Sequence, residues 1–137
     1  MDARKIIVRT VVDKPADVVW KKWTTPADVM AWNSASDDWY TPSATNDLRV
    51  GGMFNFRMEA RDGSFGFDFA GTYDEVIPEK KIVYSLGDTR KLEIEFSPKD
   101  GGTLVTETFD AETQNALVLQ RNGWQAILDR FKRHAEA

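Results

Sequence analysis

The contrast between the last quarter of the chain and its middle constrains the fold most. Residues 113–135 include the stretch QRNGWQAILDRFKRH and predict one amphipathic helix, about 35 Å long at 1.5 Å per residue. The helix follows short segments in which apolar and polar residues alternate, as they do in half-buried strands. One helix must therefore cover almost the whole sheet, which favours a curved sheet with an apolar space beneath the helix.

One face of the predicted helix follows the 3.6-residue spacing of an α-helix. Its members are Leu117, Gln120, Trp124, Ile127, Leu128 and Phe131. Gly123 lies mid-helix, where glycine costs about 1 kcal/mol relative to alanine. We interpret Gly123 as a position where the helix backbone comes close to the sheet. The Trp124 side chain would then lie deep between the helix and the strands.

The N-terminal third predicts a strand and two short helices. Residues 4–12 are rich in β-branched side chains and form the strand. A helix follows to about Thr24, and Thr25-Pro26-Ala27-Asp28 is a capping signature that begins the second helix. Residues 33–46 predict a polar loop containing two aromatic residues.

Six more strands are predicted after this loop. The first is marked by Leu48 and Val50 and ends at Gly51-Gly52, and the second and third show the period of two most clearly. Gly71 and the DEVIP segment bend and end the third. The second to sixth cover residues 53–59, 65–69, 81–86, 91–96 and 103–109. The whole is one α+β domain, residues 1–137, with an antiparallel sheet of about seven strands.

Composition excludes several classes of function. The chain has no cysteine, so disulfides, thiolate catalysis and zinc–sulfur sites are excluded. A formal net charge of -4 disfavours nucleic acid and anionic membranes as partners. The N-terminus has no apolar stretch long enough for a signal peptide or a membrane span, so we expect a cytoplasmic protein. We also expect it to be a monomer.

Catalytic and metal-binding residues are not predicted. His134, the only histidine, lies in FKRHAEA, where we expect a frayed and solvated helix end. The adjacent Asp37 and Asp38 could bind a cation, but carboxylates in polar loops are usually solvated. We expect no metal, no cofactor and no catalytic group, and hence no enzyme.

Charged residues in the strands are predicted to face solvent. Alternation assigns them to the outer face of the sheet, and the alternative is a carboxylate pair that points inward and serves acid–base chemistry. These residues are Arg57, Glu59, Asp68, Glu93, Glu95 and Glu107.

Several motifs carry a resemblance to a known family. They are Val19-Trp20, Trp32 after Pro26, DLRVGG at 47–52, GTYDEVIP at 71–78 and Gly123-Trp124. With the order of elements, they resemble the helix-grip fold of the START/birch-pollen-allergen (SRPBCC) superfamily. Within it, the chain resembles the family named for the C-terminal domain of the activator of the heat-shock protein 90 ATPase.

The resemblance implies a cavity between sheet and helix in a superfamily that includes lipid carriers, cyclases, hydrolases and chaperone modulators. The activator's N-terminal domain has no counterpart among these 137 residues. We therefore expect no strong stimulation of a chaperone ATPase by this chain alone.

Non-catalytic binding of a small hydrophobic ligand in that cavity is the leading hypothesis. The alternatives are a chaperone-modulating interaction module and an enzyme of the cyclase or hydrolase type. The sequence leaves open whether the apolar residues form a filled core or a pocket wall. Trp39 could also belong to the core, and the Arg121 side chain could extend to solvent instead of contacting a ligand. The candidate ligand-binding residues are Trp39 and Tyr40 (rim), Gln120 and Arg121 (polar contacts), and Phe54, Phe56, Met58, Phe67, Phe69, Tyr84, Leu117, Trp124 and Leu128 (wall).

Overall fold

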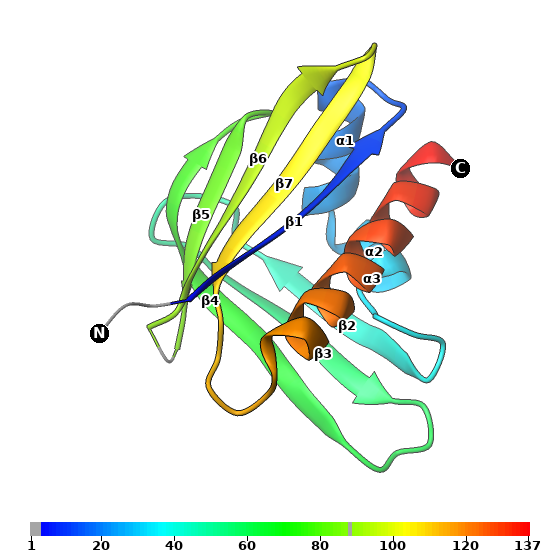
Figure 1. Cartoon of the computed structure of the whole chain (residues 1–137), viewed down its shortest axis with the longest axis vertical. Helices are drawn as coiled ribbons and strands as arrows, with labels where there is room; N and C mark the ends of the chain where they lie inside the picture. Colours follow the sequence, from blue (N-terminus) through cyan, green and yellow to red (C-terminus); the bar gives the residue numbers. More distant parts are fainter. Residues whose placement is uncertain (1–3, 88) are drawn as a thin grey trace.

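A seven-stranded antiparallel sheet forms the body of the protein in the computed structural model, which describes residues 4–87 and 89–137 (Figure 1). The strands lie in the order β1-β7-β6-β5-β4-β3-β2, and the sheet curls around the side that α3 covers. This arrangement confirms the predicted α+β helix-grip fold. The elements are β1 (Lys5–Val12), α1 (Ala16–Thr24), α2 (Pro26–Trp32), β2 (Trp39–Asn46), β3 (Met53–Ala60), β4 (Gly66–Ile77), β5 (Lys81–Leu86), β6 (Lys91–Lys99), β7 (Gly102–Asp110) and α3 (Leu117–Glu136).

The two short helices close one end of the curled sheet. α1 packs against β6 and β7, α2 packs against β2, and both contact α3. Along β5 and β7, buried and half-buried residues alternate strictly, as the period of two predicts. Tight turns with positive φ lie at Gly63, Asp100 and Gly101.

The position of the second strand was predicted wrongly. The predicted polar loop contains β2, whereas Leu48 and Val50 lie in the turn that joins β2 to β3. β2 is an edge strand that pairs only with β3, and its pairing shifts register between Tyr40 and Ser43, around Pro42. Because an edge strand tolerates proline and polar side chains, β2 lacks the apolar alternation that marks the inner strands.

β4 and α3 also depart from their predicted bounds. β4 extends beyond the predicted residues 65–69 and ends at Ile77. Its bulge between Tyr73 and Glu75 and its end both fall at the DEVIP segment, which was predicted to bend and end it. α3 begins at Leu117, four residues later than predicted, and runs unbroken through Gly123. The predicted sheet-spanning helix is therefore present without a break.

Gly123 does not mark a close approach of helix and sheet, as predicted. A Cβ atom built there would meet no described atom of the sheet within 4 Å. The close approach occurs at Gly71, where a Cβ would lie 2.7 Å from the Ser85 carbonyl oxygen and 2.9 Å from the Phe54 ring. Glycine is therefore required on the sheet, beneath Phe54, and not on the helix.

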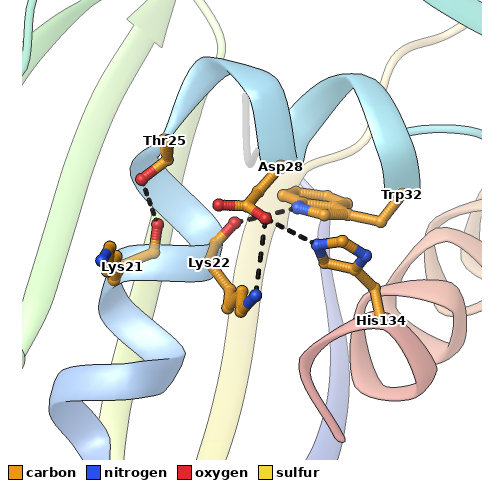
Figure 2. Close-up of polar contacts among 6 residues, drawn as sticks. All are labelled: Lys21, Lys22, Thr25, Asp28, Trp32 and His134. Atoms are coloured by element: carbon orange, nitrogen blue, oxygen red, sulfur yellow. Dashed lines mark hydrogen bonds and ion pairs between the residues drawn. The ribbon is translucent and has the colours of Figure 1, made fainter. Parts of the chain in front are cut away.

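The end of α3 is also not the frayed, solvated segment that we expected. His134 Nε2 lies 2.8 Å from Asp28 Oδ1 on α2, and Lys22 Nζ lies 3.7 Å from the same oxygen (Figure 2). Thr25 holds the N-cap position of α2, but its hydroxyl donates back to the Lys21 carbonyl oxygen instead of capping the helix. The predicted capping signature therefore places Thr25 at the N-cap without a side-chain capping bond, and Asp28 joins α2 to α3.

Candidate functional site

A cavity of about 170 Å³ lies between α3 and the inner face of the sheet. The strands β3, β4, β5 and β7 supply its floor, and Trp124 and Ile127 of α3 supply its cover. Phe67, 39% exposed, marks the side on which the cavity reaches the surface. Seven of the predicted site residues line it: Phe54, Phe56, Met58, Phe67, Phe69, Tyr84 and Trp124.

Seven further lining residues were missed by the sequence analysis. Trp23 and Trp32 come from the two short helices, whose apolar faces must meet the same sheet as α3. Glu107 shares the strand phase of Val105 and Phe109, so its inward direction was visible in the alternation of β7. The missed residues are Trp23, Trp32, Asn33, Tyr73, Ile82, Glu107 and Ile127.

Aromatic contacts hold the cavity wall in shape. The Trp124 ring stacks on Phe109 with centroids 4.2 Å apart and meets the Phe69 ring at 5.9 Å. Phe54 contacts Tyr84 at 4.7 Å and Phe56 at 5.0 Å. Such offset or edge-to-face pairs stabilise a fixed arrangement of rings, so the wall is preformed.

Glu107 is the unexpected feature of this wall. It was predicted to face solvent, but it is only 4% exposed and lines the cavity. Because burial penalises the charged form, the pKa of the Glu107 carboxyl rises from its usual value to about 8. The carboxyl is therefore mostly neutral at pH 7, and it can donate a hydrogen bond.

Two tyrosines lie on the same wall. Burial, with a smaller contribution from the charge of Glu107, raises the pKa of Tyr84 well above its ordinary value. Burial also raises the pKa of Tyr73. The Tyr73 hydroxyl donates a hydrogen bond to Asn46 Oδ1 at 2.5 Å. Both phenols thus stay neutral at physiological pH.

The other charged strand residues lie outside the cavity. Arg57 Nε is 3.0 Å from Glu59 Oε2, and Arg57 Nη1 is 3.6 Å from Asp68 Oδ1. Glu93 pairs with Lys81 at 2.9 Å, and Glu95 is exposed. The outward assignment therefore fails for Glu107 alone among the six.

Four predicted site residues on α3 lie away from the cavity. Leu117 and Arg121 are exposed, and Leu128 is completely buried in the core. Gln120 is buried, but its side chain accepts from the backbone of Glu112 and donates to the carbonyl oxygens of Glu112 and Asn115. Gln120 thus fastens the segment before α3, and this use of its amide explains why the helix begins late.

The two predicted rim residues point to different faces. Trp39 contacts Phe65 and Phe67, each at 6.0 Å, beside the open side of the cavity. Tyr40 faces the outside, where its hydroxyl lies 3.4 Å from Glu59 Oε1 and Arg61 lies over its ring. Only Trp39 is adjacent to the cavity, and neither residue lines it.

Beyond the cavity, the space between α3 and the sheet is filled. Trp23 and Trp32, which line the cavity on one side, pack on Phe131 beyond it with ring centroids 4.8–5.0 Å apart. Phe131 and Leu128 are completely buried. One part of α3 therefore covers a pocket, and the part that contains Leu128 and Phe131 covers a filled core.

The start of α3 carries an exposed apolar patch, which we call the helix-start patch. Val118 and Leu119 are 64% and 60% exposed, and Ile7 and Leu117 lie beside them. Contiguous apolar surface of this kind is typical of contact sites for other molecules.

Within residues 4–87 and 89–137, no group of three acidic or histidine side chains is placed to hold a metal ion. Asp37, from the acidic pair that was considered as a cation site, forms an ion pair with Arg130. Across the same residues, no helix combines the length and apolarity needed to cross a membrane.

Comparison with known proteins identifies the family. The family model described as Activator of Hsp90 ATPase homolog 1-like protein matches residues 13–136. The chain belongs to this family. The AHSA1-like proteins are part of the SRPBCC superfamily, as the sequence motifs indicated, and no curated protein sequence matches the chain.

Solved structures agree with this assignment. The solution NMR structure of an AHSA1-like protein from Aeromonas hydrophila is 42% identical and covers 97% of this chain and 92% of that one, with a TM-score of 0.90. Chr148 from Cytophaga hutchinsonii is 45% identical, with 96% and 92% covered and a TM-score of 0.85. NE0264 from Nitrosomonas europaea, at 21% identity, 96% and 93% coverage and a TM-score of 0.81, shows the fold alone. AHSA1-like membership supports a binding or chaperone-modulating module.

Proposed function

We propose that this AHSA1-like protein binds a small hydrophobic ligand, without catalysis, in the cavity beneath α3. The observation that carries the proposal is a cavity of about 170 Å³ with a preformed and mostly aromatic wall. Small-molecule sites are concave and largely apolar, with few polar groups. Glu107, Tyr84, Tyr73 and Asn33 are the polar members of this lining.

The cavity volume limits the ligand. An apolar cavity of about 150 Å³ in another protein takes up benzene, so about 170 Å³ suits one substituted ring. A long acyl chain would need the wall to open. In this proposal the lining aromatic residues hold the ring, and Trp39 lies beside the entrance next to Phe67.

Toluene, measured by isothermal titration calorimetry, is a suitable probe. We expect saturable binding to the wild type at one site. Replacing the lining residue Ile127 by Phe should fill the cavity and abolish binding, whereas Val118→Phe, on the exposed face of the same helix, should leave it intact. Absence of binding to the wild type, or equal binding to both variants, would defeat the proposal.

The helix-start patch favours a second candidate function, contact with a protein partner such as a chaperone. Two quantities should be measured separately: binding of this protein to heat-shock protein 90, and the ATPase rate of heat-shock protein 90 in its presence. We expect no strong rate increase, and we expect Val118→Asp with Leu119→Asp to weaken any complex. An unchanged complex would exclude this patch as the contact surface. A monomeric, cytoplasmic protein remains our prediction.

A further inference from the structure

The cavity contains two polar groups that have no partner of their own. Among the described residues, neither the Glu107 carboxyl nor the Tyr84 hydroxyl takes part in a hydrogen bond or an ion pair. Burying such a group without a partner costs free energy, and native proteins usually avoid it. The other polar lining residues differ, since Tyr73 donates to Asn46 and Asn33 bonds Thr41.

Both unpaired groups face the cavity. Glu107 is 4% exposed and Tyr84 is 8% exposed, and both belong to the lining. Among the described residues, no unpaired side-chain oxygen is completely sealed from solvent-sized space. The oxygens of Glu107 and Tyr84 therefore retain accessible surface, and the cavity is the space that supplies it.

The sheet register explains how two strands bring these groups to one face. Glu107 of β7 pairs with Ile94 of β6, and Ile94 pairs with Ile82 of β5. Tyr84 lies two residues beyond Ile82 on β5, so it shares the inward phase. The charge of Glu107 also acts on Tyr84, which places the two groups near one another.

We propose that the Glu107 carboxyl, assisted by the Tyr84 hydroxyl, anchors a small aromatic ligand by donating a hydrogen bond to a carbonyl oxygen of that ligand. A carboxyl enclosed by aromatic rings, with no arginine or lysine in the lining, stays neutral and so offers an O–H donor. The aromatic wall accommodates the ring, and the donor fixes its orientation. This inference rests on the proposed binding function of the cavity and names the ligand class.

A pair of probes with the same shape tests it. Acetophenone carries a carbonyl where α-methylstyrene carries a methylene group, so only acetophenone can accept the hydrogen bond. At a pH below the pKa of Glu107, we expect the wild type to bind acetophenone roughly threefold to tenfold more tightly than α-methylstyrene. Glu107→Gln retains a donor and should keep this preference. Glu107→Leu should lose the preference while it still binds α-methylstyrene.

The outcomes separate the inference from the function on which it rests. If neither probe binds the wild type, both the cavity function and the inference are wrong. If the two probes bind equally, or Glu107→Leu keeps the preference, the cavity binds ligands but the donor role is wrong. Benzylamine is the remaining probe, because a charged carboxylate would prefer this cation. Tighter binding of benzylamine than of acetophenone, abolished by Glu107→Gln, would also overturn the inference.

Discussion

The two halves of α3 cover the same sheet but meet it differently. In residues 128–136, Leu128, Phe131 and Ala135 are buried, and the helix is fastened to α2 and to β1. In residues 117–127, Trp124 and Ile127 cover a cavity, while Val118 and Leu119 face solvent. α1 and α2 fill only one end of the curled sheet. That end, under residues 128–136, becomes core, and we call it the closed half. The other end, under residues 117–127, retains the cavity, and we call it the open half.

Glu107 gives the largest expected effect, because it places an ionisable group in the wall of the open half. Burial raises its pKa to about 8 from the ordinary value of 4.5, so the folded state holds the proton more tightly than the unfolded state. This contribution to stability is complete below about pH 4.5 and is lost as the pH rises to about 8, by roughly 3–5 kcal/mol in total.

Urea denaturation of the wild type and Glu107→Gln over this pH range checks the effect. The free energies of unfolding should diverge with rising pH, with the wild type falling further. Because the other titrating groups are shared, the difference isolates Glu107. Parallel curves would show that the carboxyl is solvated and that the open half is wetter than the structure indicates.

A matched pair of phenylalanine replacements compares the two halves directly. Phe131→Ala removes a completely buried ring and should cost about 3–5 kcal/mol, as for other large core truncations. Phe67→Ala, at the open side, should cost about 1 kcal/mol because the ring is already 39% exposed. Similar losses of the free energy of unfolding in the two variants would contradict the division.

His134→Ala tests the link between α3 and α2. Loss of the contact with Asp28 should cost about 1 kcal/mol, since the pair is partly exposed. Toluene affinity should not change, because His134 lies in the closed half. The exposed Arg133→Ala is the control and should change stability by less than about 0.5 kcal/mol. A loss of ligand binding with His134→Ala would mean that the two halves are coupled.

Gly123→Ala should have the smallest effect, and it should be a gain. The position is mid-helix with open space around the added Cβ, so alanine should stabilise the protein by about 0.5–1 kcal/mol. Thermal denaturation is sufficient to detect it. A loss of stability would restore the view that this part of α3 needs a close backbone approach.

Periodicity predicted the inner strands, the antiparallel sheet and the spanning helix, because buried faces impose alternation on a sequence. It failed at β2, an edge strand whose inward-facing positions include polar residues such as Thr41, so that its burial leaves no apolar alternation. It also failed at Glu107, because charge was given more weight than the phase that Glu107 shares with Val105 and Phe109.

The sequence pattern could predict site residues only to the extent that it shows which side chains point toward the inner face. Phe54, Phe56 and Trp124 were assigned to the inner face correctly, but inward direction does not distinguish cavity from core. That distinction depends on how far α1 and α2 extend into the curl, which is a property of tertiary packing. The amide of Gln120 was likewise taken for a ligand contact, because its use in fastening residues 112–115 depends on the path of the loop.

Methyl NMR of the wild type during a toluene titration tests the central claim most directly. The account predicts saturable shifts at Met58, Ile82 and Ile127, which line the cavity, and much smaller shifts at Val19, Val29 and Leu128, which are completely buried in the core. Shifts of equal size at both ends, shifts confined to Val118 and Leu119 of the helix-start patch, or no saturable shift would contradict it.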